Sequence, residues 1–299
     1  MMFNTKRFLV TGGAGFIGTQ LIKHLLNKYE DCVILSVDNY FTGLIENHIT
    51  DPRVTYLACC TTEINQNAST VNFSPDIVFH LGEFSRIVKS FDDIEECHKF
   101  NMAGTFQVLL YCRKTNARLV YAASSSKFGN NGEDQHLSPY AWMKAKNIEL
   151  INNWHHWYGL DFVITYFYNV YGPGQIMSGD YAAVIGRFQQ QVIDNQPITV
   201  VAPGTQRRDF TNVEDIVRGI VLAAEKGSGD GYLLGTGKNY TLLEIAEAFD
   251  HPYMIIPERK GERFSGQAYP SKAEEELGWV AEHNIIEYIK NWKKEFTKP

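Results

Sequence analysis

The stretch that decides the fold is Thr11-Gly12-Gly13-Ala14-Gly15-Phe16-Ile17-Gly18, in which three glycines recur at intervals of three. An apolar run at residues 7–10 precedes it, and apolar residues at helical spacing follow it, namely Leu21, Ile22, Leu25 and Leu26. This pattern is a strand, a tight turn and a helix. Glycines in such a turn let the backbone approach a pyrophosphate closely and let the helix pack against the strand. The stretch therefore predicts a dinucleotide-binding turn.

A carboxylate follows the next apolar run. Residues 32–37 have the pattern of a buried strand, and Asp38 stands directly after them. An aspartate at this strand end accepts hydrogen bonds from a ribose diol and repels a 2′-phosphate. We therefore expect NAD, rather than NADP, as the cofactor.

Strand-like and helical patterns then alternate along the chain. Apolar runs at 54–58, 77–81, 118–123 and 162–167 are separated by helical patterns that include 102–111 and 138–158. Such alternation is typical of a parallel sheet with helices on both faces, whose ligands bind beyond the carboxyl ends of the strands. We therefore predict an α/β fold with a Rossmann-type doubly wound parallel sheet.

The bulk composition excludes several classes of protein. The net charge is −6, and no basic run is present, so neither nucleic acid nor an anionic membrane is indicated as a partner. No apolar run reaches the roughly 20 residues of a membrane span. No metal site is predicted, since the adjacent His155 and His156 would point in different directions on a helix. The odd number of cysteines, without zinc-type spacing, fits a reducing, cytoplasmic compartment: Cys32, Cys59, Cys60, Cys97 and Cys112.

Tyr140 and Lys144 stand four residues apart in the stretch Ser138-Pro139-Tyr140-Ala141-Trp142-Met143-Lys144. On a helix they share one face. A tyrosine has a pKa of about 10, and a neighbouring ammonium lowers that pKa by favouring the phenolate. Such a pair can move a proton to or from a substrate hydroxyl. The spacing alone is a weak signal, because tyrosine and lysine often meet on a solvated helix by chance.

Taken with other motifs, these stretches resemble the extended short-chain dehydrogenase/reductase superfamily. Within it the chain is similar to the NAD-dependent nucleotide-sugar epimerase/dehydratase family, and most of all to UDP-glucose and UDP-N-acetylglucosamine 4-epimerases. The other motifs are His80-Leu81, Ser124-Ser125-Ser126-Lys127-Phe128-Gly129, Tyr168-Asn169-Val170-Tyr171-Gly172-Pro173, Arg208-Asp209-Phe210 and Leu234-Gly235-Thr236-Gly237. They run through essentially the whole chain in the order of the family.

The resemblance implies two lobes and a set of site residues. An NAD-binding Rossmann domain is expected over residues 1–170, with returning segments near 210–235, and residues 171–299 are expected to form mainly a smaller, C-terminal substrate-binding lobe. The implied catalytic residues are Tyr140, Lys144 and Ser124. The implied cofactor-binding residues are Gly12, Gly15, Phe16, Ile17, Gly18, Asp38, Asn39, Leu81, Tyr140 and Lys144. The implied substrate-binding residues are Ser125, Ser126, Arg86, Asn169, Arg208 and Arg259.

The reaction type depends on Ser125 and Ser126. Family members that dehydrate the sugar have an Asp-Glu pair at these positions, and decarboxylating members typically have a Glu at the second. Serine hydroxyls do not supply the proton chemistry of a carboxylate at neutral pH. We therefore expect a nucleotide-sugar 4-epimerase that oxidises the sugar transiently at C4. A 4,6-dehydratase or a decarboxylase stays an alternative, because Glu133 or Asp134 of the following loop could approach the site.

Among several departures from the family pattern, two lie close to the expected sugar site. Glu83 replaces a usual alanine after His80-Leu81, and Arg86 stands where a small residue near the sugar is expected. Arg86 either reads an anionic group of the substrate or pairs with Glu83 in a structural role, and the sequence leaves both readings open.

The resemblance also bears on partners. A UDP-sugar is the substrate that it suggests most strongly, and a homodimer is the expected assembly. Phe106, Leu109, Leu110, Leu150, Ile151 and Trp154 would either form a four-helix dimer interface or pack inward. A hypothesis of another class is a non-catalytic, NAD-binding, redox-responsive scaffold, against which the presence of Tyr140, Lys144 and Ser124 argues.

Overall fold

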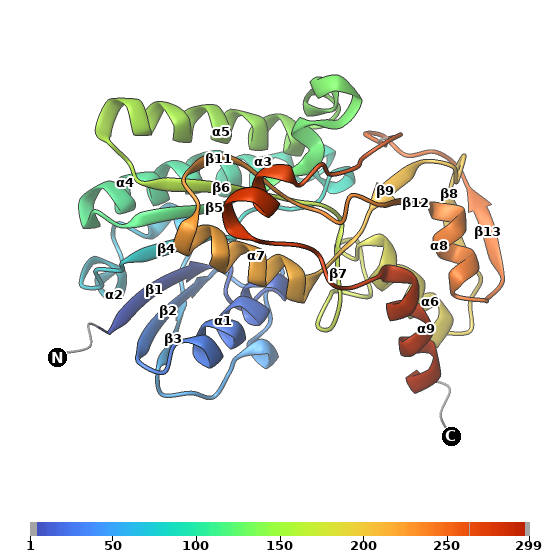
Figure 1. Cartoon of the computed structure of the whole chain (residues 1–299), viewed down its shortest axis with the longest axis horizontal. Helices are drawn as coiled ribbons and strands as arrows, with labels where there is room; N and C mark the ends of the chain where they lie inside the picture. Colours follow the sequence, from blue (N-terminus) through green and yellow to red (C-terminus); the bar gives the residue numbers. More distant parts are fainter. Residues whose placement is uncertain (1–4, 263, 297–299) are drawn as a thin grey trace.

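The computed structural model describes residues 5–262 and 264–296, and its centre is a sheet of seven parallel strands (Figure 1). The strands follow the order β11-β6-β5-β4-β1-β2-β3. Strands β2 and β3 therefore lie on one side of β1 and the later strands on the other, so the strand order reverses between β1 and β4. This confirms the predicted Rossmann-type fold, and it places the ligand crevice at that switch point. The bounds are β1 Lys6–Thr11, β2 Cys32–Asp38, β3 Val54–Ala58, β4 Ile77–His80, β5 Arg118–Ser124, β6 Phe162–Phe167 and β11 Gly229–Leu234.

Helices cover both faces of the sheet because both faces are apolar. Successive side chains of a strand point to opposite faces. Phe8 and Val10 of β1 belong to the core formed with α1 (Phe16–Lys28) and α7 (Val213–Lys226). Leu9 belongs to the core formed with α4 (Thr105–Thr115) and α5 (Pro139–Tyr158). Figure 1 shows α4 and α5 on one side of the sheet and α1 and α7 on the other.

Shorter helical segments connect these layers. α4 continues directly from a π-helical segment, Lys99–Gly104, so the helix expected at 102–111 begins inside that segment.

No helix in the described part of the chain is long and apolar enough to cross a membrane. The remaining short segments are the helices α2 Ala68–Val71 and α3 Ile94–His98, the 3-10 turns Ile45–Asn47, Thr61–Glu63, Val88–Phe91, Ser125–Lys127 and Gly129–His136, and the π-helical turn Ala273–Leu277.

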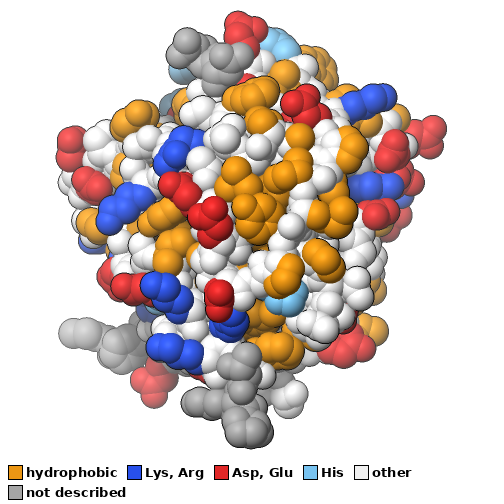
Figure 2. Space-filling view, turned by 90° about the vertical axis from the view of Figure 1, so that its right-hand side faces the viewer, with side chains coloured by type: hydrophobic (Ala, Val, Ile, Leu, Met, Phe, Trp, Pro, Cys, Tyr) orange, Lys and Arg blue, Asp and Glu red, His pale blue; other side chains and the backbone are white. Residues whose placement is uncertain are grey.

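The segments after β6 form a smaller lobe with a core of its own, which includes Phe188, Ile198, Phe249 and Ile289. α7 and β11 return from it to the main sheet, and the domain boundary at residue 170 stays a prediction. Figure 2 looks at this end of the molecule and shows hydrophobic side chains gathered on its face. Its elements are β7 Val170–Tyr171, α6 Val184–Ile193, β8 Ile198–Val201, β9 Arg207–Asp209, β10 Thr211–Asn212, β12 Asn239–Thr241, α8 Leu242–Ala248, β13 Tyr253–Ile256 and α9 Ile285–Phe296.

Candidate active site

A cavity of about 640 Å³ lies between the carboxyl ends of the central strands and the smaller lobe. Every predicted site residue except Ser126 lines it. The strands bring these residues together, because the carboxyl ends of parallel strands meet at one edge of the sheet. The glycine turn follows β1, Asp38 ends β2, Leu81 follows β4 and Ser124 ends β5.

The glycine turn has no room for side chains. Gly12 has φ +71°, a left-handed conformation that favours glycine, and an added Cβ would lie 2.9 Å from the Cα of Gly82. A Cβ on Gly18 would lie 2.1 Å from the carbonyl oxygen of Gly12. α1 begins next to this turn at Phe16, and no side chain caps its first N–H groups. The turn therefore fits the pyrophosphate of a dinucleotide, which needs bare backbone and free N–H groups.

Asp38 is buried and lines the cavity. Its Oδ2 accepts a hydrogen bond from the Ala14 N–H (3.0 Å), and its Oδ1 accepts one from the Tyr40 N–H (2.8 Å). These bonds fix the carboxylate beside the glycine turn. Burial raises the pKa of Asp38 from its ordinary value. The position suits a ribose diol and disfavours the additional phosphate of NADP.

Tyr140 and Lys144 lie in the first two turns of α5. Ser138 caps this helix by accepting a hydrogen bond from the Ala141 N–H (3.1 Å), and Pro139 occupies its first turn. The cap fixes where the helix begins and so points both side chains into the cavity. Ser124 faces them from the end of β5.

Ser126 lies behind Ser124 rather than in the lining of the cavity. Its hydroxyl donates a hydrogen bond to Ser124 Oγ (2.9 Å), and the residue is buried. Ser126 therefore orients the Ser124 hydroxyl. Its role as a substrate contact stays a prediction, as does that of Ser125, which does line the cavity.

Lys144 forms an ion pair with Glu83. Its Nζ donates to Glu83 Oε2 and to the carbonyl oxygen of Ala122 (2.6 Å for the latter), and both charged side chains are almost fully buried. In the described part of the chain, no hydrogen bond joins Lys144 Nζ to the Tyr140 hydroxyl. The lysine is thus held firmly beside Tyr140, with its charge balanced by a carboxylate.

Glu83 is the centre of a buried polar network. Its Oε1 accepts hydrogen bonds from Thr105 Oγ1 (2.6 Å), Asn147 Nδ2 (2.9 Å) and Tyr121 Oη (3.1 Å). His80 bonds the same Thr105 hydroxyl through Nε2 (3.0 Å). Burial lowers the pKa of His80 to about 4, so the imidazole is neutral at pH 7. The sequence marks Glu83 only as an unusual residue, and this role was missed.

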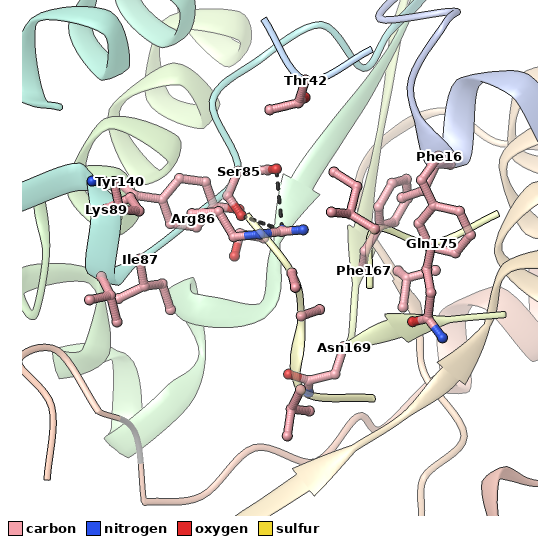
Figure 3. Close-up of a pocket in the computed structure, with 18 of the residues that line it drawn as sticks. Phe16, Thr42, Ser85, Arg86, Ile87, Lys89, Tyr140, Phe167, Asn169 and Gln175 are labelled. Carbon is pink, nitrogen blue, oxygen red and sulfur yellow. Dashed lines mark hydrogen bonds between the residues drawn. The ribbon is translucent and has the colours of Figure 1, made fainter. Parts of the chain in front are cut away.

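Arg86 projects into the middle of the cavity (Figure 3). Its Nε donates to the Tyr181 carbonyl oxygen (2.5 Å), and its Nη1 donates to the Ser85 carbonyl oxygen (2.9 Å). Figure 3 shows the guanidinium between Tyr140 on one side and Phe16 and Gln175 on the other. No ion pair joins it to Glu83 in the described part of the chain, since Glu83 pairs with Lys144 instead.

Two arginines of the smaller lobe share one carboxylate. Arg208 Nη2 lies 2.6 Å from Glu262 Oε1, and Arg259 Nη2 lies 3.5 Å from Glu262 Oε2. Asn169 also lines the cavity and donates from Nδ2 to the Asp209 carbonyl oxygen (2.7 Å). Sequence reasoning missed Glu262, because nothing in the local pattern shows that both arginines converge on it.

Few acidic residues are found in the described lining of the cavity. The acidic residues among the described lining of the cavity are Asp38, Glu83, Asp180 and Glu262. Neither Glu133 nor Asp134 is in that lining, although both were considered as acids or bases. Within residues 5–262 and 264–296, no three His, Cys, Asp or Glu side chains are grouped so as to hold a metal ion.

The sheet order, the glycine turn and the Tyr140–Lys144 pair define a dinucleotide-dependent protein of the short-chain dehydrogenase/reductase superfamily. A model of the NAD-dependent epimerase/dehydratase family matches residues 8–235, and the chain belongs to that family. NAD is accordingly its cofactor, in agreement with the turn and with Asp38.

Curated relatives with different reactions resemble the chain about equally. A putative UDP-glucose 4-epimerase of Methanocaldococcus jannaschii is 29% identical over 306 residues, which cover 96% of this chain and 98% of the relative. UDP-glucuronic acid decarboxylase 3 of Arabidopsis thaliana is 28% identical over 315 residues, which cover 97% and 89%. The family is therefore clear, but the reaction is not determined by this likeness.

Solved structures of two 4-epimerases also resemble the chain over nearly its whole length. The UDP-glucose 4-epimerase of Thermotoga maritima, crystallised with UDP-glucose, superimposes with a TM-score of 0.88 at 25% identity, covering 97% of this chain and 98% of its own. The UDP-glucuronic acid 4-epimerase of Bacillus cereus, crystallised with UDP-glucuronic acid and NAD, has a TM-score of 0.86 at 25% identity with the same coverage.

Proposed function

We propose that the protein is an NAD-dependent nucleotide-sugar 4-epimerase. The observation that carries this proposal is the chemistry around Tyr140: hydroxyls at Ser124 and Ser125, and no contribution to the cavity lining from Glu133 or Asp134. Elimination of water needs an acid and a base at the sugar. Inversion at C4 needs only a group that takes and returns the hydroxyl proton, besides the hydride exchange.

Each residue at this end of the cavity has a part in the mechanism. Tyr140 takes the proton of the C4 hydroxyl and gives it back after the intermediate has turned. Ser124 donates a hydrogen bond to the reacting oxygen, with its hydroxyl oriented by Ser126. Lys144 is fixed by Glu83 and Ala122, and it would donate a hydrogen bond to the nicotinamide ribose of bound NAD. When bound, NAD would supply the acceptor and donor of hydride at C4.

The smaller lobe binds the nucleotide end of the substrate, which we propose to be a UDP-sugar. Arg208, Arg259 and Asn169 line the cavity wall away from the glycine turn. Guanidinium groups suit a diphosphate because they present a planar fork of donors. The UDP-sugars named for the relatives support this choice.

The test is product analysis on a panel of UDP-, GDP- and dTDP-sugars by NMR. The C4 epimer without net formation of NADH is the expected result. A 4-keto-6-deoxy sugar would show a dehydratase, and a pentose with loss of CO₂ would show a decarboxylase. NAD binding without conversion of any sugar would favour a non-catalytic scaffold.

We also propose a homodimer in the cytoplasm. Leu109, Ile151 and Trp154 pack inward, but Phe106 on α4 and Trp157 on α5 remain exposed and offer an apolar surface for a second copy. None of the five cysteines forms a disulfide in the structure. Light scattering on the purified protein tests the assembly, with a dimeric mass as the expected result.

A further inference from the structure

We propose that Arg86 forms a salt bridge with a carboxylate on the sugar itself, so that the substrate is a nucleotide-linked uronic acid. This inference rests on the proposed function and names its substrate class. It also resolves the choice that the sequence left open, since the partner of Glu83 is Lys144 and not Arg86.

The charge of Arg86 has no counterion in the described part of the chain. The other cations at this end of the cavity are compensated: Lys144 by Glu83, and Lys89 by Asp92, Asp93 and Asp180. Burial lowers the pKa of Arg86 from its ordinary value, which reflects the cost of holding its charge away from water. An unpaired cation in such a place is costly unless a ligand brings the opposite charge.

The guanidinium is already aimed at a ligand. The Tyr181 and Ser85 carbonyls hold Nε and Nη1, and Nη2 makes no hydrogen bond within residues 5–262 and 264–296. Nη2 therefore remains a donor toward the cavity, and the two backbone contacts keep the group from folding away. A guanidinium fixed in this manner loses little side-chain entropy when it binds a carboxylate.

The position of Arg86 selects which anion it meets. The cofactor pyrophosphate belongs at the Gly12–Gly18 turn, and the substrate diphosphate belongs near Arg208. Arg86 lies beside Tyr140, which acts on the C4 hydroxyl (Figure 3). The carboxylate of a uronic acid is attached to C5, the carbon next to C4, so it lies within reach of a group beside Tyr140.

Arg187 provides a matched control. It also lines the cavity, and in the described part of the chain it has no ion pair, but it stands on α6 in the smaller lobe. A general electrostatic effect on UDP binding would involve Arg187 at least as much as Arg86. A contact with the sugar carboxylate would involve Arg86 alone.

Calorimetric titration of the NAD-loaded Tyr140→Phe variant, in which turnover is expected to be slow, tests the inference with UDP-glucuronate and UDP-glucose. These ligands differ only at C6, which is a carboxylate in the first and a hydroxymethyl group in the second. We expect UDP-glucuronate to bind about 10–100-fold more tightly, as for a charged hydrogen-bonded pair. Adding Arg86→Gln should remove this preference and leave UDP-glucose affinity within about threefold. Adding Arg187→Gln should leave the preference intact.

Equal affinity for the two ligands, or an equal loss for both in Arg86→Gln, would overturn the inference. So would a loss of NAD affinity in Arg86→Gln, since it would assign the arginine to the cofactor. Epimerisation of UDP-glucose without any preference for UDP-glucuronate would leave the proposed function standing and remove this inference. Arg86-dependent binding of UDP-glucuronate followed by loss of CO₂ would leave this inference standing and would remove the proposed epimerase function.

Discussion

The two ends of the cavity are constructed differently. The pyrophosphate part of the cofactor end is formed by one stretch, from Gly12 to Asp38, and its essential feature is a tightly packed backbone turn. The reaction end is formed by side chains from distant segments: Glu83 and Lys144 are 61 residues apart, and Arg86 is held by the Tyr181 carbonyl, 95 residues away. The first end depends on local conformation, whereas the second depends on packed and paired charges.

The largest effect should come from Tyr140→Phe, which removes the group that moves the proton. We expect turnover to fall roughly a thousandfold or more, because positioned acid–base groups contribute about 10²–10⁴. NAD affinity should stay within about threefold, since the glycine turn is untouched. Steady-state kinetics and NAD titration check both values. Near-normal turnover would remove Tyr140 from its role.

The next effect concerns the buried ion pair. Glu83→Gln leaves the Lys144 ammonium buried without a counterion, and breaking such a pair costs about 3–5 kcal/mol. We expect a loss of this size in the free energy of unfolding, measured with urea. Glu133→Gln changes an exposed residue and is the matched control. It should change the free energy of unfolding little.

A double-mutant cycle sharpens that result. Glu83→Gln combined with Lys144→Met removes both charges, so the combined loss of stability should be smaller than the sum of the two single losses. Strict additivity would contradict the pairing of Glu83 with Lys144.

His80 makes the reaction end sensitive to acid. Its pKa is about 4 in the folded protein and about 6.5 when the chain is unfolded, so only the unfolded chain takes up a proton between these values. His80 therefore costs no stability above pH 6.5. It lowers stability as the pH falls toward 4, by about 2 kcal/mol at pH 5.

His80→Asn measures this contribution. Urea unfolding at pH 7 and pH 5 should show a smaller loss of stability on acidification in the variant than in the wild type. An identical pH dependence in both proteins would show that His80 is not held neutral by burial.

At the cofactor end, alanine substitutions at two glycines should weaken NAD binding to different extents. A Cβ on Gly18 would lie 2.1 Å from the Gly12 carbonyl oxygen, whereas one on Gly15 would lie 3.2 Å from the same atom. We expect Gly18→Ala to weaken NAD binding by roughly 10–100-fold, which corresponds to about 1.4–2.8 kcal/mol of strain. Gly15→Ala should have the smaller effect. Equal effects would mean that close packing of the turn does not control affinity.

The smallest effect is expected at Glu262, which occupies the two arginines assigned to the diphosphate. Glu262→Gln removes this internal anion, so UDP should bind a few-fold more tightly, as for a partly exposed charge pair. Glu258→Gln, on an exposed neighbour, is the control for net charge. Weaker UDP binding in Glu262→Gln would show instead that Glu262 itself contacts the nucleotide.

The sequence predicted the elements that depend on local patterns. The glycine turn, Asp38 at the end of β2 and the start of α5 after Ser138 follow from residue types at fixed spacing, and most of the predicted site residues line one cavity. The partners of Lys144, Arg86 and Arg208 did not follow from the sequence. Which carboxylate or carbonyl meets each cation is decided by tertiary packing, for which one sequence carries no spacing signal.

The central claim is that the sugar is oxidised at C4 and then reduced at the same carbon. The bonds at the other carbons of the sugar stay intact. The most direct test is conversion of UDP-glucuronate and UDP-glucose, supplied separately in D₂O, with the products read by NMR. The account predicts a C4 epimer that carries no solvent deuterium on its ring carbons, because the hydride returns from the cofactor. A pentose or a 4-keto-6-deoxy sugar that has taken up deuterium from the solvent would contradict it.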